Sequence, residues 1–205
     1  MLLVSAPSGA GKTTVCQGLL AAQPALARAI TCTTRPPRAG EEEGRDYYFL
    51  SPAEFERRVR QGEFLEHAEV YGYRYGTLRA EVRRRLETGQ DVLLNIDVQG
   101  AASVRAAASD DALLRSALVT VFLTTSSLEE LARRLAGRAT DSPETIQRRL
   151  AVARSELAKA PDFDYLLISG TMEEDRRRLE TIYQAEKLRS SRVPLPDLAG
   201  PGGIG

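Results

Sequence analysis

A glycine-rich run near the amino terminus is where residue types and spacing point most directly to chemistry. It reads Ala6-Pro7-Ser8-Gly9-Ala10-Gly11-Lys12-Thr13-Thr14 and follows an apolar stretch. In such a loop the backbone N–H groups point at a bound anion, and the next helix adds the partial positive charge of its N-terminus. Lys12 can then bridge the outer phosphates of a nucleoside triphosphate, and the Thr13 hydroxyl is placed to ligate Mg²⁺. The alternative is a glycine-rich turn before an ordinary helix.

Two arginines on a proline-stiffened segment indicate a second phosphate site. Arg35 and Arg38 lie in the run Thr31-Cys32-Thr33-Thr34-Arg35-Pro36-Pro37-Arg38-Ala39-Gly40-Glu41. Guanidinium groups pair with phosphate oxygens through two parallel hydrogen bonds, so a fixed pair of arginines suits one phosphate. The alternative is a proline-rich loop with solvated arginines, because three of the 28 basic residues are lysines and the other 25 are arginines.

A carboxylate at the end of an apolar stretch is expected at the same site. Residues 92–96 have the pattern of a buried strand, and Asp97 follows them directly. Ligands of open α/β sheets gather at the carboxyl ends of the strands. Asp97 is therefore expected either to orient a water molecule on Mg²⁺ or to contact the second substrate. The alternative is that it caps the next helix.

The sequence lacks the residues that other hydrolytic or metal chemistry would need. His67 is the only histidine, so neither a Ser/His/Asp arrangement nor a histidine metal cluster can be built. Phosphoryl transfer to a phosphate monoester needs neither, because the second pKa of the acceptor is about 6 and its oxygen is mostly ionised at neutral pH. We expect His67 to pack or to form hydrogen bonds.

The bulk composition limits the partners and the setting. The 205 residues carry 28 acidic and 28 basic side chains, a balance that favours neither nucleic acid nor a membrane surface as partner. Cys16 and Cys32 lack C-x-x-C spacing, and no apolar run reaches membrane-spanning length. We therefore expect a cytoplasmic protein without a signal peptide. The sequence leaves open whether it is a monomer or a homodimer.

Short apolar runs that alternate with helical patterns must position these residues. They lie at residues 2–4, 92–96, 119–123 and 165–168. This alternation predicts an α/β fold in which helices flank a parallel sheet, while glycines, prolines and aromatic residues between 31 and 77 predict a small, partly β insertion. The expected parts are a core domain at 1–30 and 78–190, with a helical lid at about 134–149, the insertion at 31–77, and a flexible tail at 191–205.

In order and spacing, the motifs of this chain resemble those of guanylate kinase from residue 2 to about residue 189. They are T-x-T-T-R-x-P-R-x-G-E at 31–41, Gly44-Arg45-Asp46-Tyr47, Phe64-Leu65-Glu66-His67-Ala68, Tyr75-Gly76-Thr77 and Asp97-Val98-Gln99-Gly100. The resemblance implies a P-loop NTPase-type core with a GMP-binding insertion and a lid. It implies that the enzyme moves the γ-phosphoryl group of ATP to GMP with Mg²⁺, a reaction of GMP recycling and guanine nucleotide supply. We expect dGMP as a second acceptor, a point that the sequence alone does not decide.

The resemblance also assigns the site residues. The glycine-rich run, Ala6, Pro7, Ser8, Gly9, Ala10, Gly11, Lys12, Thr13 and Thr14, would bind ATP, with Mg²⁺ on Thr13 and, through water, on Asp97. The GMP phosphate would be held by Arg35, Arg38, Tyr47 and Tyr75, and the guanine end by Thr31, Glu66, Thr77 and Asp97. The catalytic residues would be Lys12, Arg35 and the lid arginines Arg134, Arg138 and Arg149.

Glu66 suits guanine on chemical grounds as well. Guanine presents N1–H and the N2 amino group side by side, and one ionised carboxylate accepts both, whereas adenine has no such pair of donors. A site that leaves a buried polar group unpaired rejects the wrong substrate by roughly 10⁴–10⁵-fold. The alternative for Glu66 is a surface charge in a strand.

The chain departs from the family pattern at three places, which are Asn95 where a carboxylate is usual, Ala139 after Arg138, and Ser169-Gly170 near the adenine. In the phosphate loop, Ala6 stands where the strict G-x-x-x-x-G-K-[ST] pattern has glycine.

Two other classes of protein compete with this interpretation. A regulatory GTPase would share the D-x-x-G pattern but would need N-K-x-D, and Asn95 is the only asparagine. Guanylate-kinase-like modules that only bind partner proteins tend to have degraded phosphate loops, whereas Lys12 and Thr13 are present here.

Overall fold

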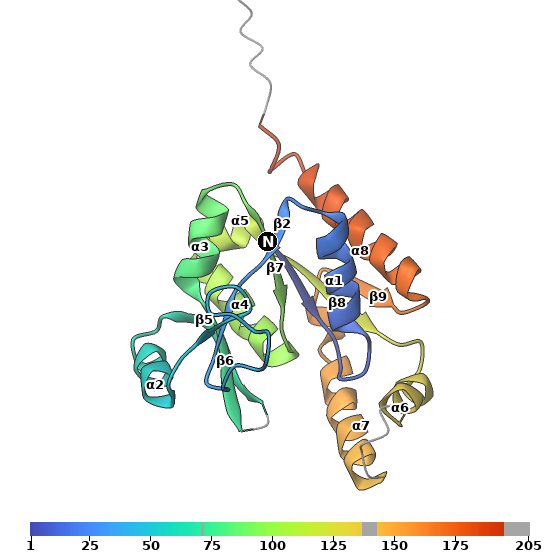
Figure 1. The fold of residues 1–205 in the computed structure, drawn as a ribbon. Coiled ribbons are helices and arrows are strands. Elements are labelled where there is room, and N and C mark those ends of the chain that lie inside the picture. The colour runs from blue at the N-terminus through green and yellow to red at the C-terminus, as the bar shows by residue number, and fades with distance from the viewer. Residues whose placement is uncertain (71, 137–142, 195–205) are drawn as a thin grey trace, which may run out of the picture.

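The larger sheet forms the centre of the molecule. The structure is a computed structural model that describes residues 1–70, 72–136 and 143–194. In that part of the chain, five parallel strands lie in the order β2-β7-β1-β8-β9 (Figure 1). The strands are β1 (Leu2–Ser5), β2 (Leu26–Arg28), β7 (Asp91–Asn95), β8 (Val119–Thr124) and β9 (Tyr165–Ile168). The predicted α/β fold with a parallel sheet is confirmed.

Strand β1 divides the core between the two faces of the sheet. Leu2 and Val4 pack on one face with α1 (Lys12–Ala22) and α8 (Met172–Lys187). Met1 and Leu3 pack on the other face with α3 (Arg79–Glu87), α4 (Val98–Asp110) and α5 (Ala112–Ala117). Successive side chains of a strand point to opposite faces, so a strand that is covered on both sides must be apolar throughout.

Two helices lie beyond the carboxyl end of β1, at the lower edge of Figure 1. They are α6 (Leu128–Ala136) and α7 (Pro143–Leu157), and the short 3₁₀ helix η1 (Ala160–Asp162) follows. Leu131, Leu135 and Ala153 join them to the core on the α1 side. These helices contain most of the expected lid, of which residues 137–142 lie outside the described residues.

The segment that was predicted to be a partly β insertion forms a second sheet of four strands. Its order is β4-β3-β6-β5, with β3 parallel to β4 and antiparallel to β6. The elements are β3 (Thr31–Thr33), β4 (Tyr47–Phe49), α2 (Pro52–Arg60), β5 (Phe64–Val70) and β6 (Tyr73–Leu78). Phe55 of α2 stacks on Phe64 with ring centroids 4.4 Å apart, which gives this sheet a small core of its own.

Helix starts follow the local signals. The Ser51 hydroxyl accepts a hydrogen bond from the backbone N–H of Glu54 at 3.1 Å, and Thr171 and Glu174 form a reciprocal capping box at the start of α8.

Among the described residues, no helix combines the length and the apolar character needed to cross a membrane. The division into core, insertion and tail stays a prediction, and residues 195–205 lie outside the described part.

Candidate nucleotide-binding site

The phosphate loop has the backbone that an anion site requires. Gly9 and Gly11 have φ angles of 92° and 95°, a region that residues with a side chain rarely adopt. A Cβ atom at Gly9 would also lie 2.9 Å from Leu135 of α6. Helix α1 begins at Lys12, and its N-cap Gly11 supplies no side-chain cap. The N-terminal end of α1 therefore offers uncapped N–H groups to a phosphate.

Lys12 lies beside the carboxyl end of β7, the strand next to β1 in the sheet. Its ammonium group donates a hydrogen bond to the carbonyl oxygen of Ile96 at 2.6 Å. Burial lowers the pKa of Lys12, and the nearby carboxylates of Asp97, Glu156 and Glu66 act in the opposite direction. The cation is thus placed at the end of the loop, on a neutral oxygen that a phosphate can replace.

Strand register brings four of the predicted acceptor residues into one row. Thr31 of β3 pairs with Tyr47 of β4 on one side and with Thr77 of β6 on the other, and Thr77 pairs in turn with Glu66 of β5. Tyr75 lies two residues from Thr77 and therefore on the same face. All five side chains line one cavity.

This cavity joins the second sheet to the phosphate loop. It has a volume of about 510 Å³ and is also lined by Lys12, Thr13, Asn95 and Asp97. Arg28 of β2 lines it too, and its guanidinium group lies over the Tyr47 ring at 5.6 Å. The cavity therefore reaches Lys12 and Thr13 on the expected donor side and the expected acceptor residues other than Arg35 and Arg38, which do not line it.

Glu66 is a buried carboxylate that faces the cavity. It is only 6 % exposed, and it accepts a hydrogen bond from the Thr77 hydroxyl at 2.6 Å. Burial raises the pKa of Glu66, and the charge of Asp97 adds to the effect. Gly100 leaves room for this carboxylate, since a Cβ atom there would lie 3.0 Å from Glu66 Oε2. The surface-charge alternative for Glu66 is excluded by its burial.

Asp97 caps a helix, as in the alternative considered for it, and also lines the cavity. Its carboxylate caps α4 by accepting a hydrogen bond from the backbone N–H of Gly100 at 2.8 Å. The same side chain lines the cavity next to Lys12. Capping fixes the direction of the carboxylate, and its other oxygen remains available for a ligand.

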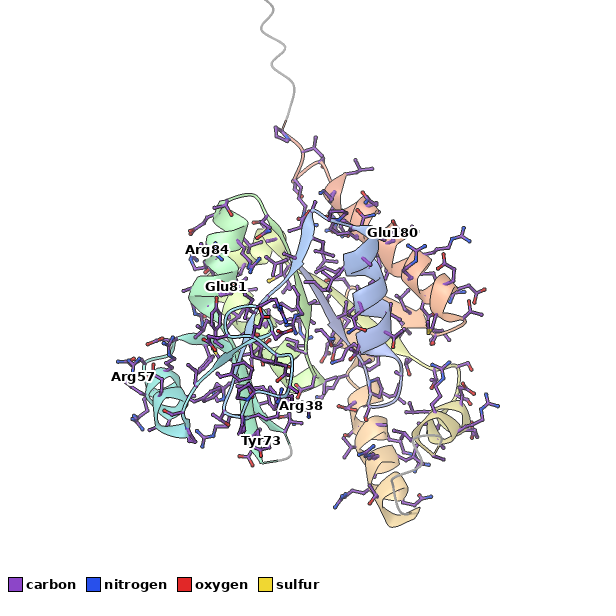
Figure 2. The ribbon with its side chains drawn as sticks, viewed as in Figure 1. Arg38, Arg57, Tyr73, Glu81, Arg84 and Glu180 are labelled. Carbon is purple, nitrogen blue, oxygen red and sulfur yellow. The ribbon has the colours of Figure 1, made fainter. Side chains whose placement is uncertain are left out.

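The two predicted phosphate arginines differ in environment. Arg35 is 8 % exposed, and its Nη2 donates to both carboxylate oxygens of Glu41 at 2.8 and 2.9 Å. Its guanidinium group also lies over the Tyr47 ring at 5.4 Å, and the bond to Glu41 raises the pKa of Arg35. Arg38 is exposed, on the side of the insertion that faces the core in Figure 2, and its backbone N–H donates to Glu41. A carboxylate thus contacts Arg35 where a phosphate was predicted.

The lid residues are placed only in part. Arg134 donates to Glu130 at 2.8 Å and to the Ser169 hydroxyl at 3.1 Å, so it lies beside one of the departures from the family pattern. Arg149 lies on α7 and is half-buried. Arg138 and Ala139 lie outside the described residues.

His67 is exposed, does not line the cavity, and contacts the rings of Phe55 and Phe64.

Two further residues at the site were missed by the sequence analysis. Arg28 lies on a short strand without a motif, and nothing in its surroundings marks it. Glu156 lies on α7 among arginines, where a carboxylate suggests only a solvated helix face. Burial raises the pKa of Glu156, which lies near Asp97, Lys12 and the backbone N–H of Ser8.

The donor set fits Mg²⁺ held mainly by phosphates. Among the described residues, no three His, Cys, Asp or Glu side chains converge to hold a metal ion. Mg²⁺ usually keeps several waters and takes one or two protein oxygens beside the substrate phosphates. Thr13, which lies in the first turn of α1, and Asp97 are oxygen donors at this cavity.

A phosphate loop after the first strand of a parallel sheet, joined by one cavity to the polar face of a second sheet, is typical of a P-loop kinase with a nucleotide acceptor. The family model for guanylate kinase matches residues 1–186. A guanylate kinase of Thermobifida fusca is 49% identical over 174 residues, which cover 85% of each chain. One of Paramagnetospirillum magneticum is 42% identical over 198 residues, or 96% of this chain and 90% of the relative.

A solved structure has the same fold. The crystal structure of guanylate kinase from Anaplasma phagocytophilum superimposes with a TM-score of 0.71 at 33% identity, and covers 94% of this chain and 88% of its own. The chain belongs to the guanylate kinase family, whose members are ATP:GMP phosphotransferases. The predicted family and reaction are confirmed.

Proposed function

We propose that this protein transfers the γ-phosphoryl group of ATP to GMP within the cavity between the phosphate loop and the second sheet. The observation that carries the proposal is the continuity of this cavity from Lys12 and Thr13 to Glu66 and Thr77. Two nucleotides that bind at its ends would meet with their phosphates between them. Alignment of this kind supplies much of the catalysis in phosphoryl transfer.

On the donor side, the loop from Ala6 to Thr14 would hold the ATP phosphates through its backbone N–H groups. Lys12 would leave the Ile96 carbonyl for the β- and γ-phosphates. Mg²⁺, bound by Thr13 and through water by Asp97, would neutralise charge on the transferring group. Arg134 and Arg149 are the described lid cations that would add positive charge there, and Arg138 is proposed by resemblance alone.

On the acceptor side, Glu66 would accept both N–H donors of the guanine edge, and Thr31 and Thr77 would align with the base. Tyr47 and Tyr75, which line the cavity, would hold the GMP phosphate together with Arg35, which lies two residues beyond the end of β3, with Arg38 reaching in from the exposed segment. The acceptor oxygen is already ionised at neutral pH, so none of these side chains needs to act as a general base.

Two finer points belong to the same proposal. dGMP should be accepted, because the residues assigned to the acceptor bind its base and its phosphate. Cys16 and Cys32 are buried and unpaired, and burial raises the pKa of each thiol to about 12, which supports a reducing compartment such as the cytoplasm.

A coupled assay of ADP formation tests the proposal. With ATP and Mg²⁺, GMP and dGMP should give rapid ADP release, whereas AMP, UMP and CMP should give little. Equal release with and without GMP would indicate a simple NTPase. No release in any mixture, with intact folding, would favour a module that only binds partners. Lys12→Ala should lower turnover by orders of magnitude while the circular dichroism spectrum stays unchanged.

A further inference from the structure

One carboxylate beside the phosphate loop lacks a hydrogen-bond partner for one of its oxygens. Oε2 of Glu156 is buried and has no partner among the described residues. Glu156 lies near the carboxyl end of α7, three residues after the fully buried Ala153. Since buried polar atoms are nearly always paired, an orphaned carboxylate oxygen points to an ordered water or an ion as its partner.

The residues around Glu156 belong to the phosphate loop and its neighbours. Its charge interacts with those of Lys12 and Asp97, and the backbone N–H of Ser8 faces it. Ala153, one turn earlier, packs in the same core as Ala6 and Ala10 of the phosphate loop. The packing of α7 therefore holds Glu156 against the phosphate loop.

The charge balance at this wall is unfavourable for a free nucleotide. Three carboxylates, those of Asp97, Glu156 and Glu66, act on the ammonium group of Lys12. A polyphosphate that approaches them is repelled, whereas a divalent cation between them and the phosphates reverses the sign of the interaction. Asn95, which lines the cavity from the end of β7, adds no negative charge, so Glu156 supplies a further carboxylate from a different element.

We propose that Glu156 is a positioning residue for Mg²⁺, and that its unpaired oxygen accepts hydrogen bonds from the water ligands of the ion. The inference rests on the proposed function only in that it places ATP or ADP at the phosphate loop. Glu156 thereby makes nucleotide binding depend on Mg²⁺, because the same charge disfavours the metal-free nucleotide and favours its Mg²⁺ complex.

The opposite signs of these two effects make the proposal testable by binding alone. Calorimetric titration with ADP, in Mg²⁺ and in EDTA, gives two dissociation constants for each variant. In Glu156→Gln, ADP should bind more tightly than to the wild type in EDTA and more weakly in Mg²⁺. The ratio of the two constants should fall by about 10- to 100-fold, the range found when a partner of a metal ligand is removed.

Two variants serve as controls. Glu87→Gln removes an equally charged side chain on α3, 55% exposed and not among the residues that line the cavity, and should leave the ratio unchanged. Glu156→Asp keeps the charge and should retain most of the Mg²⁺ dependence. Thermal unfolding and the circular dichroism spectrum establish that each variant is folded.

The outcomes separate this inference from the proposed function. If Glu156→Gln changes both dissociation constants by the same factor, or neither, Glu156 has no role toward Mg²⁺ and the inference is overturned. If the wild type binds ADP under neither condition, the donor assignment fails and this inference fails with it. A ratio that falls for Glu156→Gln and is retained in Glu156→Asp supports both.

Discussion

Replacing Glu66 by glutamine tests how the acceptor base is selected. Glutamine has almost the same size as glutamate, so the hydrogen bond from the Thr77 hydroxyl, 2.6 Å long in the structure, can be kept by the amide oxygen. The amide nitrogen then replaces the second carboxylate oxygen and sets a donor against a donor of guanine. The charge is lost as well.

The burial of Glu66 determines how large the loss in kcat/KM for GMP should be. At 6 % exposure, water cannot replace the missing acceptor. A hydrogen bond to a charged group contributes about 1.5–3 kcal/mol, and one such bond is lost while the other is weakened. We therefore expect a loss of about 2–4 kcal/mol in transition-state stabilisation, or roughly 30- to 1000-fold in kcat/KM for GMP.

Steady-state kinetics with each substrate varied in turn measure this loss. The kcat/KM for GMP should fall by the stated factor and that for ATP should change little, because Glu66 lies at the acceptor end of the cavity. Glu69→Gln, at an exposed position on the same strand, should leave both values unchanged. An equal fall for GMP and ATP in Glu66→Gln would mean that Glu66 is structural and that guanine is read elsewhere.

The same carboxylate gives the enzyme a pH dependence with a definite sign. Burial raises the pKa of Glu66, and only the ionised form accepts both guanine N–H groups. GMP binding that depends on Glu66 is therefore present above this raised pKa and is lost as the pH falls through it. The ionisation of the GMP phosphate at about pH 6 affects both proteins, so the difference between wild type and Glu66→Gln isolates Glu66. If GMP binding fell with pH in the same way in the wild type and in Glu66→Gln, the assignment of Glu66 would be contradicted.

Three further substitutions test other parts of the site. Gly100→Ala should raise the KM for GMP with little change in stability, because its Cβ atom would lie 3.0 Å from Glu66 Oε2; an unchanged KM would show that the carboxylate has room to move. Arg35→Lys should raise the KM for GMP by roughly 10- to 150-fold while the KM for ATP is retained, since lysine cannot reproduce the bidentate geometry. Phe55→Ala should cost about 3–5 kcal/mol of folding free energy and abolish GMP binding before ADP binding, as measured by denaturant unfolding and calorimetry; simultaneous loss would contradict an insertion with its own core.

Local signals explain why much of the fold could be predicted. Strand β1 is apolar because both faces of the sheet are covered, and the glycines of the phosphate loop are needed for left-handed backbone. Each feature depends on neighbours in the sequence. The acceptor row is different, because Tyr47, Thr31, Thr77 and Glu66 come together only through the register of four strands. That register is set by non-local pairing, and the resemblance to a family supplied what the pattern could not.

Two carboxylates were missed by the sequence analysis for the same reason. Glu41 was taken only as the end of a motif, yet its carboxylate contacts Arg35. Glu156 reaches the phosphate loop only because α7 packs there. In both cases the charge is typical of a solvated segment, and its role depends on which distant element lies against it. The inference that a charged side chain lies on a solvated surface holds for most of the arginines and glutamates of this chain. It fails at these two positions.

Lys12, which is half-buried, and Arg35, which is buried, both have partners before phosphate binds. Lys12 donates to a carbonyl oxygen and Arg35 to a carboxylate, so neither cation is left without an acceptor before the substrates arrive. Unpaired buried charges would be costly, and these acceptors hold the side chains near their working positions. The substrate phosphates must then replace or share these partners, which lowers the net gain from each contact. Discrimination between bases would follow a different rule, because Glu66 is buried and has acceptor capacity that suits the two N–H donors of a guanine edge.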